Sequence, residues 1–221
     1  MVEIELAGTL LRLLPERCAY VPAAHALLVA DAHLGKAHSF RRLGVPVPEG
    51  PTQDSLARLS AAITRTGARR VIFLGDLLHS RHAQADAAVA PVQRWREQHA
   101  ELDLVLVRGN HDRHAGDPPA DWRVQAVEEP MALETLQLQH HPAPPMPGRY
   151  ALAGHLHPAV RLSGRGRDQL RLPCFHFGLQ LGVLPAFGDF TGSHLVQRLS
   201  GDRVFALAAG QVIELPGPAT G

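Results

Sequence analysis

Groups of metal-ligand residues follow five short apolar runs of this 221-residue sequence. Each group contains aspartate, asparagine or histidine, and a glycine precedes three of the five. The groups are Asp31-Ala32-His33, Gly75-Asp76-Leu77-Leu78-His79, Gly109-Asn110-His111-Asp112, His140-His141-Pro142 and Gly154-His155-Leu156-His157. Carboxylate, imidazole and amide oxygen together suit manganese, iron or zinc, whereas calcium prefers oxygen ligands alone. The residue types therefore predict a centre for first-row divalent metals.

The spacing within the groups indicates how the side chains reach a common centre. In an extended segment, residues i and i+2 project to the same side. Asp31 with His33, and His155 with His157, are therefore expected to point together. The preceding glycines permit sharp turns and close approach of the backbone. Sites in α/β sheets form in the crevice beyond the carboxyl ends of strands, so we expect all five groups at one rim.

The elements that must carry these groups alternate between strand and helix in the first half of the chain. We expect a hairpin at 2–6 and 9–14, strands at 25–30, 70–74 and 102–107, helices at 52–67 and 83–98, and a loop at 35–51. Continuous apolar runs indicate the buried strands, and apolar residues at helical spacing indicate the helices. The alternation predicts a partly parallel sheet with helices on its faces.

The second half of the chain contains short strands separated by glycine and proline turns, which predicts a mainly antiparallel sheet. No repeat and no linker interrupts the sequence, so we expect a single domain over residues 1–221. The expected fold class is α/β, a four-layer α-β-β-α sandwich of two mixed sheets flanked by helices.

The composition limits the classes of protein to consider. The formal net charge is +1, so a nucleic acid would have to bind through a local patch. Two cysteines do not make a disulfide framework. No signal-peptide layout and no apolar run of about 20 residues is present. We expect a soluble protein of the cytoplasm, with association to the nucleoid as an option.

The five groups, in this order, resemble the calcineurin-like metallophosphoesterases. The family pattern is D-x-H, G-D-x-x-H, G-N-H-D, a lone H and G-H-x-H, and all five blocks occur between residues 31 and 157. The resemblance implies one metal held by Asp31, His33, Asp76 and His157, and a second held by Asp76, Asn110, His140 and His155. Asp76 would bridge the two ions.

The resemblance also implies a mechanism. Two ions roughly 3.5–4 Å apart bind phosphate oxygens and lower the pKa of a bridging water, whose hydroxide attacks phosphorus in line. His111 would stabilise the phosphoryl charge or protonate the leaving oxygen, with Asp112 orienting its ring. The lone ligand is expected to be His140, because the family ligand directly follows its strand. His141 stays open, since sequence does not determine strand register.

Outer motifs narrow the resemblance to one bacterial subgroup, the ligase-associated DNA damage response endonucleases. The motifs are Asp31 to Lys36, Phe40-Arg41-Arg42, Gly44, Gly75 to Ser80, Leu184 to Phe187 and Phe190-Thr191-Gly192. This likeness covers roughly residues 2 to 215. It implies DNA, single- or double-stranded, as substrate, manganese as the metal, a role in DNA repair, and functional association with a DNA ligase and a helicase.

Basic residues lie next to three of the blocks and are candidates for contacts with substrate phosphates. They are Lys36, the only lysine, with Arg41, Arg42, Arg81 and Arg113, and His79 is a further candidate. The alternative for each arginine is a solvated surface residue, because arginine is abundant in this chain. A structural hydrogen bond is an equal alternative for His79.

Three functions remain open from sequence alone. The first is a DNA endonuclease or phosphodiesterase. The second is a small-molecule phosphatase or nucleotide phosphodiesterase. The third is a scaffold without activity, which the intact set of seven ligands argues against. Metal content separates the third from the others, and salt-dependent DNA binding separates the first two.

Overall fold

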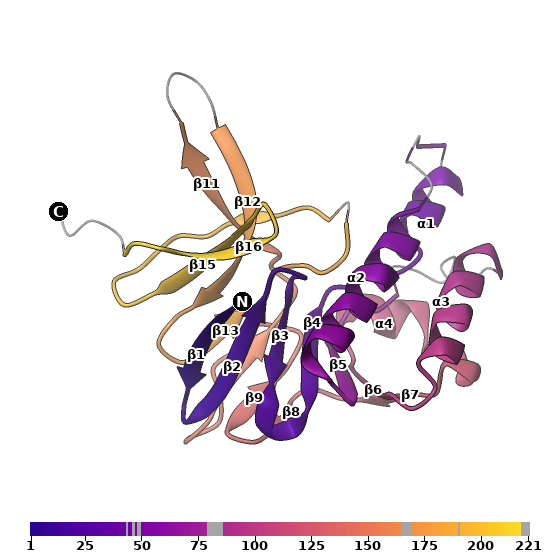
Figure 1. Cartoon of the computed structure of the whole chain (residues 1–221), viewed down its shortest axis with the longest axis horizontal. Helices are drawn as coiled ribbons and strands as arrows, with labels where there is room; N and C mark the ends of the chain where they lie inside the picture. Colours follow the sequence, from indigo (N-terminus) through magenta and orange to yellow (C-terminus); the bar gives the residue numbers. More distant parts are fainter. Residues whose placement is uncertain are drawn as a thin grey trace.

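The computed structural model describes residues 1–42, 44, 45, 47, 50–78, 86–164, 169–189 and 191–217. Within these residues, two mixed β-sheets pack face to face and helices cover one side of the first sheet (Figure 1). The expected α/β fold with two mixed sheets is confirmed. The described helices all precede residue 123, so the helical layer belongs to the first sheet.

The first sheet has the strand order β1 to β7. Its strands are β1 Val2–Leu6, β2 Thr9–Leu14, β3 Cys18–Val21, β4 Ala26–Ala30, β5 Arg70–Leu74, β6 Asp103–Val107 and β7 Val124–Val127. The pairs from β1 to β4 are antiparallel, and those from β4 to β7 are parallel. The β1–β2 hairpin closes through Ala7 and Gly8, which both have positive φ, as a two-residue turn requires.

The helices that follow these strands are α1 Lys36–Arg42, α2 Pro51–Thr66, α3 Asp86–Gln98 and α4 Asn110–Ala115, with 3-10 turns at Pro22–Ala24 and Ala120–Trp122. Helix α2 ends as expected at Gly67, whose φ is 67° and whose N–H donates to Ile63. In the described part of the chain, no helix has the length and apolar character needed to cross a membrane.

The second sheet has the order β14-β11-β12-β13-β10-β9-β8, and β12 also pairs with β15, which pairs with β16. Its strands are β8 Met131–Leu133, β9 Leu136–Leu138, β10 Tyr150–Ala153, β11 Pro158–Ser163, β12 Gln169–Phe177, β13 Leu181–Val183, β14 His194–Leu195, β15 Arg203–Ala208 and β16 Gln211–Leu215. Strand β10 runs parallel to both of its neighbours, β9 and β13. The chain segments after β9 and β10 therefore leave the sheet at the same edge.

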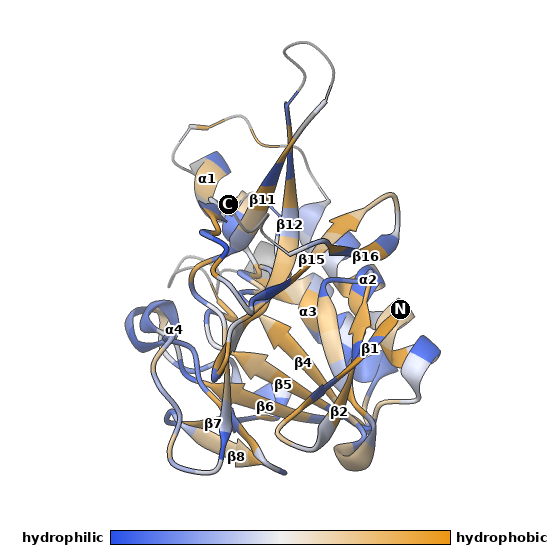
Figure 2. Ribbon diagram, turned by 90° about the vertical axis from the view of Figure 1, so that its left-hand side faces the viewer, coloured by the Kyte–Doolittle hydropathy of each residue, from blue (hydrophilic) through white to orange (hydrophobic). Residues whose placement is uncertain are grey.

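Two apolar layers hold the sheets and helices together. Alternate residues of β4 and β5, such as Val29 and Phe73, pack against α2 and α3. The intervening residues along the same two strands, such as Leu28 and Ile72, face the opposite side and pack against the second sheet. Figure 2 shows β4, β5 and β6 as hydrophobic along their length, as expected for strands buried on both faces.

Two local expectations were wrong. Residues 36–42 form helix α1 instead of part of a loop, because no glycine or proline lies inside this stretch although several flank it. Strand β3 was missed, because it has only four residues and lies between Pro15 and Pro22. Neither difference moves the metal-ligand groups away from the strand ends.

Candidate metal centre

Five strand ends bring the expected ligands to one rim, where the carboxyl ends of β4, β5 and β6 meet those of β9 and β10. Short contacts join the two sheets there. The N–H of His155 donates to Oδ2 of Asp31 at 2.9 Å. Nδ1 of His140 donates to the carbonyl of Leu74 at 3.0 Å. Side chains from both halves of the chain therefore face a common centre.

One group of ligand atoms comes from Asp31, His33 and His157, and these atoms all lie within 4.8 Å of one another. Nε2 of His157 is 3.5 Å from Oδ1 of Asp31. Nε2 of His33 is 3.9 Å from Oδ2 of Asp76. Ligand atoms about 2.0–2.2 Å from a shared ion lie roughly 3–4 Å apart, so this group fits one cation.

A second group surrounds Nε2 of His140. This atom is 2.9 Å from Oδ1 of Asn110, 3.1 Å from Nδ1 of His155 and 3.5 Å from Oδ1 of Asp76. Three different elements thus deliver a nitrogen or oxygen atom to one imidazole nitrogen. The spacing is again that of ligands around a common ion.

Asp76 lies between the two groups. Its Oδ1 faces His140 in the second group, and its Oδ2 faces His33 in the first. Oδ1 also accepts the N–H of His111 at 3.0 Å, which holds the carboxylate in this orientation. The two oxygens therefore point in the directions that a bridging ligand needs.

Two imidazoles are held in the tautomer that a metal requires. Nδ1 of His140 donates to the carbonyl of Leu74, and Nδ1 of His157 donates to the carbonyl of Gly192 at 2.9 Å. Since a carbonyl only accepts, Nδ1 carries the proton in both rings. In the neutral form of either ring, Nε2 is the unprotonated nitrogen and faces the centre, which is the usual arrangement of a metal-bound histidine.

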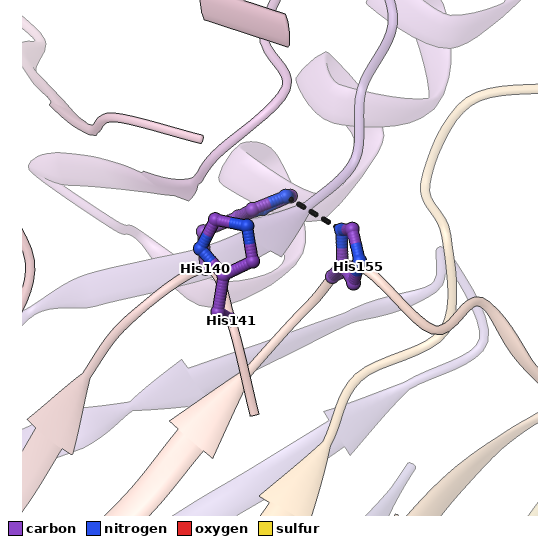
Figure 3. Close-up of side chains that lie close together, drawn as sticks. All are labelled: His140, His141 and His155. Atoms are coloured by element: carbon purple, nitrogen blue, oxygen red, sulfur yellow. Dashed lines mark hydrogen bonds between the residues drawn. The ribbon is translucent and has the colours of Figure 1, made fainter. Parts of the chain in front are cut away.

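His140 and its neighbour His141 differ in burial and in hydrogen-bond partners. Figure 3 shows His140 and His155 in direct contact, with His141 beside them. The side chain of His140 is fully buried, whereas that of His141 is 42% exposed. Nδ1 of His141 lies 2.7 Å from Oε1 of Glu129 instead of facing Asp76. Ligand atoms of His140, His141 and His155 also lie within 4.8 Å of one another. The choice of His140 over His141 therefore stays a prediction, which the burial of His140 and its contact with Asn110 support.

The electrostatics of the centre fit a divalent cation. Asp31 and Asp76 are almost fully buried within reach of one another. Burial, together with the charge of Asp31, raises the pKa of Asp76. Burial also lowers the pKa of His140, which disfavours its positive form. Oδ1 of Asp31 has no hydrogen-bond partner among the described residues. Buried charges are stable when paired or bound to metal, so the residues present suit divalent ions.

The backbone at the centre has an unusual conformation. Five of the seven expected ligands have positive φ, namely Asp31 (52°), His33 (45°), Asp76 (51°), His155 (68°) and His157 (49°). Such strain in non-glycine residues is concentrated at functional sites. The extended geometry expected for Asp31 with His33, and for His155 with His157, was therefore wrong. As a result, His155 and His157 point to different groups, although they share the rim.

Two of the expected glycines are required by close packing. A Cβ on Gly75 would overlap the ring of His140, and one on Gly109 would lie 2.5 Å from Oδ1 of Asp76. Both separations are shorter than real Cβ contacts. The absence of a side chain at these positions therefore lets the backbone approach the ligands, as the sequence indicated.

Asp112 holds the loop that carries Asp76. Its two oxygens accept the N–H groups of Asp76 at 2.7 Å, Gly109 at 2.9 Å, Leu77 at 3.0 Å and Leu78 at 3.4 Å. These bonds tie the segment after β5 to the start of α4. Burial raises the pKa of Asp112 in spite of these donors. The expected role of Asp112 in orienting the ring of His111 stays a prediction, and these contacts add a role in holding the backbone around Asp76.

His111 faces outward from this framework. Its Nε2 is 3.9 Å from Oδ2 of Asp76, and its side chain is 40% exposed. The ring is thus beside the bridging carboxylate and open to solvent. That position fits a group that contacts a substrate phosphate.

The expected phosphate-binding residues have different positions. Lys36 lines a small cavity together with the expected ligand His33. Burial lowers the pKa of Lys36, while the charges of Asp76 and Asp31 act in the opposite direction. Arg41 is exposed further along α1. Arg113 forms an ion pair with Glu128 at 2.9 Å, so its charge is already compensated. His79, Arg81 and the side chain of Arg42 lie outside the described residues.

Some supporting residues were missed by the sequence analysis. Oε2 of Glu129 accepts the N–H groups of His140 and His141 at 2.8 and 3.0 Å. Arg58 donates to the carbonyl of Phe187 at 2.6 Å, and the next residue, Gly188, donates to the carbonyl of Asp31 at 3.0 Å. No motif marks Glu129 or Arg58, because both act on backbone groups far away in sequence.

Comparisons with known proteins place this geometry in context. No protein-family model matches the chain, and no curated protein matches it. The crystal structure of Pseudomonas putida nuclease MPE is 45% identical, with a TM-score of 0.85, and the match covers 97% of this chain and 99% of that one. The phosphoesterase Yfce from E. coli is 16% identical over 86% of this chain and 97% of that one, but its TM-score of 0.41 is too low to support an argument.

The contact between Gly75 and His140 leads to a stability prediction. Gly75 and Gly8 have similar φ values, 77° and 82°, but a Cβ on Gly8 would meet nothing within 4 Å. Gly75→Ala should lower the free energy of unfolding by roughly 1–3 kcal/mol more than Gly8→Ala, because only the first overpacks the core. Denaturant unfolding of the metal-free proteins measures the difference. Equal losses would show that the contact with His140 does not matter.

The choice between neighbouring histidines leads to a second prediction. His140→Ala should lose one of two bound metals, because Nε2 of His140 faces three other ligands. His141→Ala should keep both metals, because its ring is partly exposed and pairs with Glu129. Metal analysis of both purified variants provides the measurement. The reverse result would make His141 the ligand.

Proposed function

This chain belongs to the family of metallophosphoesterase nucleases that includes Pseudomonas putida nuclease MPE, and we propose that it is a metal-dependent nuclease that cuts DNA. It is a hydrolase of phosphoric esters. We further propose that residues 1–221 form one metallophosphoesterase domain, because both apolar layers share the first sheet.

The position of Asp76 carries this proposal. Its carboxylate lies between two groups of ligands that each suit one cation. Hydrolysis of a phosphodiester needs a nucleophile at neutral pH and positive charge around the phosphoryl oxygens. Two divalent cations supply both when bound, by activating water and by neutralising charge. We propose manganese as the native metal, with iron and zinc as alternatives, because the ligands mix imidazole with carboxylate and amide oxygen.

The residues around the metals have separate roles in this proposal. Asp31, His33 and His157 hold one ion, Asn110, His140 and His155 hold the other, and Asp76 contacts both. His111 is placed to donate to the phosphoryl group or the leaving oxygen, because its ring is open to solvent beside Asp76. Asp112 positions Asp76 and the start of α4 through four backbone bonds.

Lys36 adds positive charge near the centre. It begins helix α1, and its ammonium group is influenced by both Asp31 and Asp76. A phosphate oxygen bound at the metals would lie near this charge. We therefore assign Lys36 to the phosphate that is cleaved and Arg41, further along the exposed side of α1, to a neighbouring phosphate.

DNA is the substrate that these features favour. A neutral overall charge with basic residues on α1 beside the centre suits a substrate with several phosphates. The resemblance of the outer motifs supports a role in DNA repair, with a DNA ligase and a helicase as functional associates. A small-molecule phosphatase would need no phosphate contact away from the metals.

The proposal predicts that Asp76→Asn abolishes catalysis. The amide keeps the shape but removes the shared negative charge, so both metals should bind more weakly. Asp103→Asn is the matched control, because Asp103 is partly exposed and begins β6 at the far end of the sheet from the metal centre. Metal content and cleavage of end-labelled DNA, with manganese present, are measured for both. A wild-type protein that hydrolyses mononucleotides but cuts no DNA would contradict the proposal.

The positions of Lys36 and Arg41 predict different effects. Lys36→Gln should slow cleavage of both DNA and an aryl phosphodiester roughly 10- to 100-fold, because a charged hydrogen bond contributes about 1.5–3 kcal/mol. Arg41→Gln should weaken only the reaction with DNA, because the small diester has no neighbouring phosphate. Steady-state kinetics with both substrates distinguish the two. Unchanged aryl hydrolysis in Lys36→Gln would remove Lys36 from the centre.

A further inference from the structure

The hairpin of β11 and β12 begins directly after the metal-centre residue His157. Both strands belong to the second sheet, and Figures 1 and 2 show them projecting at the same end of the molecule as α1. Its strands pair in antiparallel register, with Ala159 opposite Pro173 and Arg161 opposite Arg171. Because side chains alternate along a strand, these four residues lie on one face of the hairpin.

The other face of the hairpin is apolar near its base. Val160 belongs to a cluster with Cys174 and Val204, and Leu172 packs against it. This packing fixes which face each residue occupies. The face with the two arginines is consequently turned away from that cluster.

The two arginines place like charges directly opposite each other. Residues opposed in an antiparallel pair have Cβ atoms about 4.5–5.5 Å apart, and like charges there are destabilising. Both side chains are exposed. Among the described residues, neither forms an ion pair with a carboxylate, and Arg171 donates only to the carbonyl of Ser193. An anion between them would relieve the repulsion.

The arginine face continues into a hollow that reaches the metal centre. A cavity of about 260 Å³ is lined by His157, Ala159, Arg171 and Pro173, together with Gly188, Asp189 and residues 191–193. Its one acidic lining residue, Asp189, is already paired with Arg17 at 2.8 Å. The path from the centre to the hairpin is therefore open and without free negative charge.

We propose that Arg161 and Arg171 bind backbone phosphates of the DNA strand that flanks the cleaved bond. This inference rests on the proposed nuclease function. Each strand residue advances about 3.3 Å, so Arg161 lies roughly 13 Å along the hairpin from His157. That distance corresponds to about four nucleotides of one strand of B-DNA. The hairpin thus adds phosphate contacts along the strand to those assigned to α1.

The test compares two double variants that remove the same charge. Arg161→Gln with Arg171→Gln changes the hairpin. Arg69→Gln with Arg94→Gln is the control, because both of these arginines are exposed and lie away from the centre, before β5 and on α3. The single variant Arg161→Gln covers the case in which the double variant does not fold, because the described structure shows no bond from its side chain.

Two readouts are measured with manganese present: the salt dependence of DNA binding, and kcat/KM for DNA and for an aryl phosphodiester. The hairpin variant should flatten the slope of log K against log salt by about 1.5, since each phosphate contact contributes about 0.7–0.9. Its kcat/KM for DNA should fall at least roughly tenfold at 0.15 M salt, and aryl hydrolysis should be retained. Arg→Lys at both positions should restore most DNA binding, because the charge returns.

Other results would overturn the inference. If wild-type protein cuts DNA and the hairpin variant matches the control, the hairpin does not bind the strand and the nuclease function stands. If aryl hydrolysis falls along with DNA cleavage, the hairpin supports the metal centre instead. If wild-type protein hydrolyses the aryl diester but neither binds nor cuts DNA, the proposed function fails, and this inference with it.

Discussion

The carboxylates of Asp31 and Asp76 are buried close together where the two sheets meet, and most features of the rim can be understood from this constraint. Two adjacent negative charges out of water are costly without a cation. The neighbouring imidazoles offer nitrogen ligands, because burial lowers the pKa of His140 and because Nδ1 of His140 and of His157 donates to a carbonyl, which leaves Nε2 of each ring toward the centre. Divalent ions held by these groups would complete the charge balance.

Backbone atoms, more than side-chain packing, hold the centre in place. Carbonyls orient His140 and His157, amides fix both Asp31 and Asp112, and left-handed residues turn the chain directly after β4, β5 and β10. Such contacts tolerate little movement, since a Cβ added at Gly75 would overlap His140. The parallel pairing of β4 to β6 and of β9 with β10 aligns these strand ends at a single rim.

The sequence allowed the rim to be predicted but not its details. Apolar runs located β4, β5 and β6, and the residue types after them indicated metal chemistry before any contact was known. The extended geometry assumed for Asp31 with His33 was wrong, because both have positive φ, which residue types other than glycine do not reveal. Helix α1 was hidden by the glycines and prolines that flank it. Glu129 and Arg58 could not be found, because their partners are backbone groups distant in sequence.

The central claim is that two metals bind on either side of Asp76. Crystals grown with manganese and measured at its absorption edge test this most directly, because anomalous peaks locate each ion independently of activity. The account predicts two peaks about 3.5–4 Å apart, one next to Asp31, His33 and His157 and the other next to Asn110, His140 and His155. A single peak, or a second peak bound by His141 and away from Asp76, would contradict it.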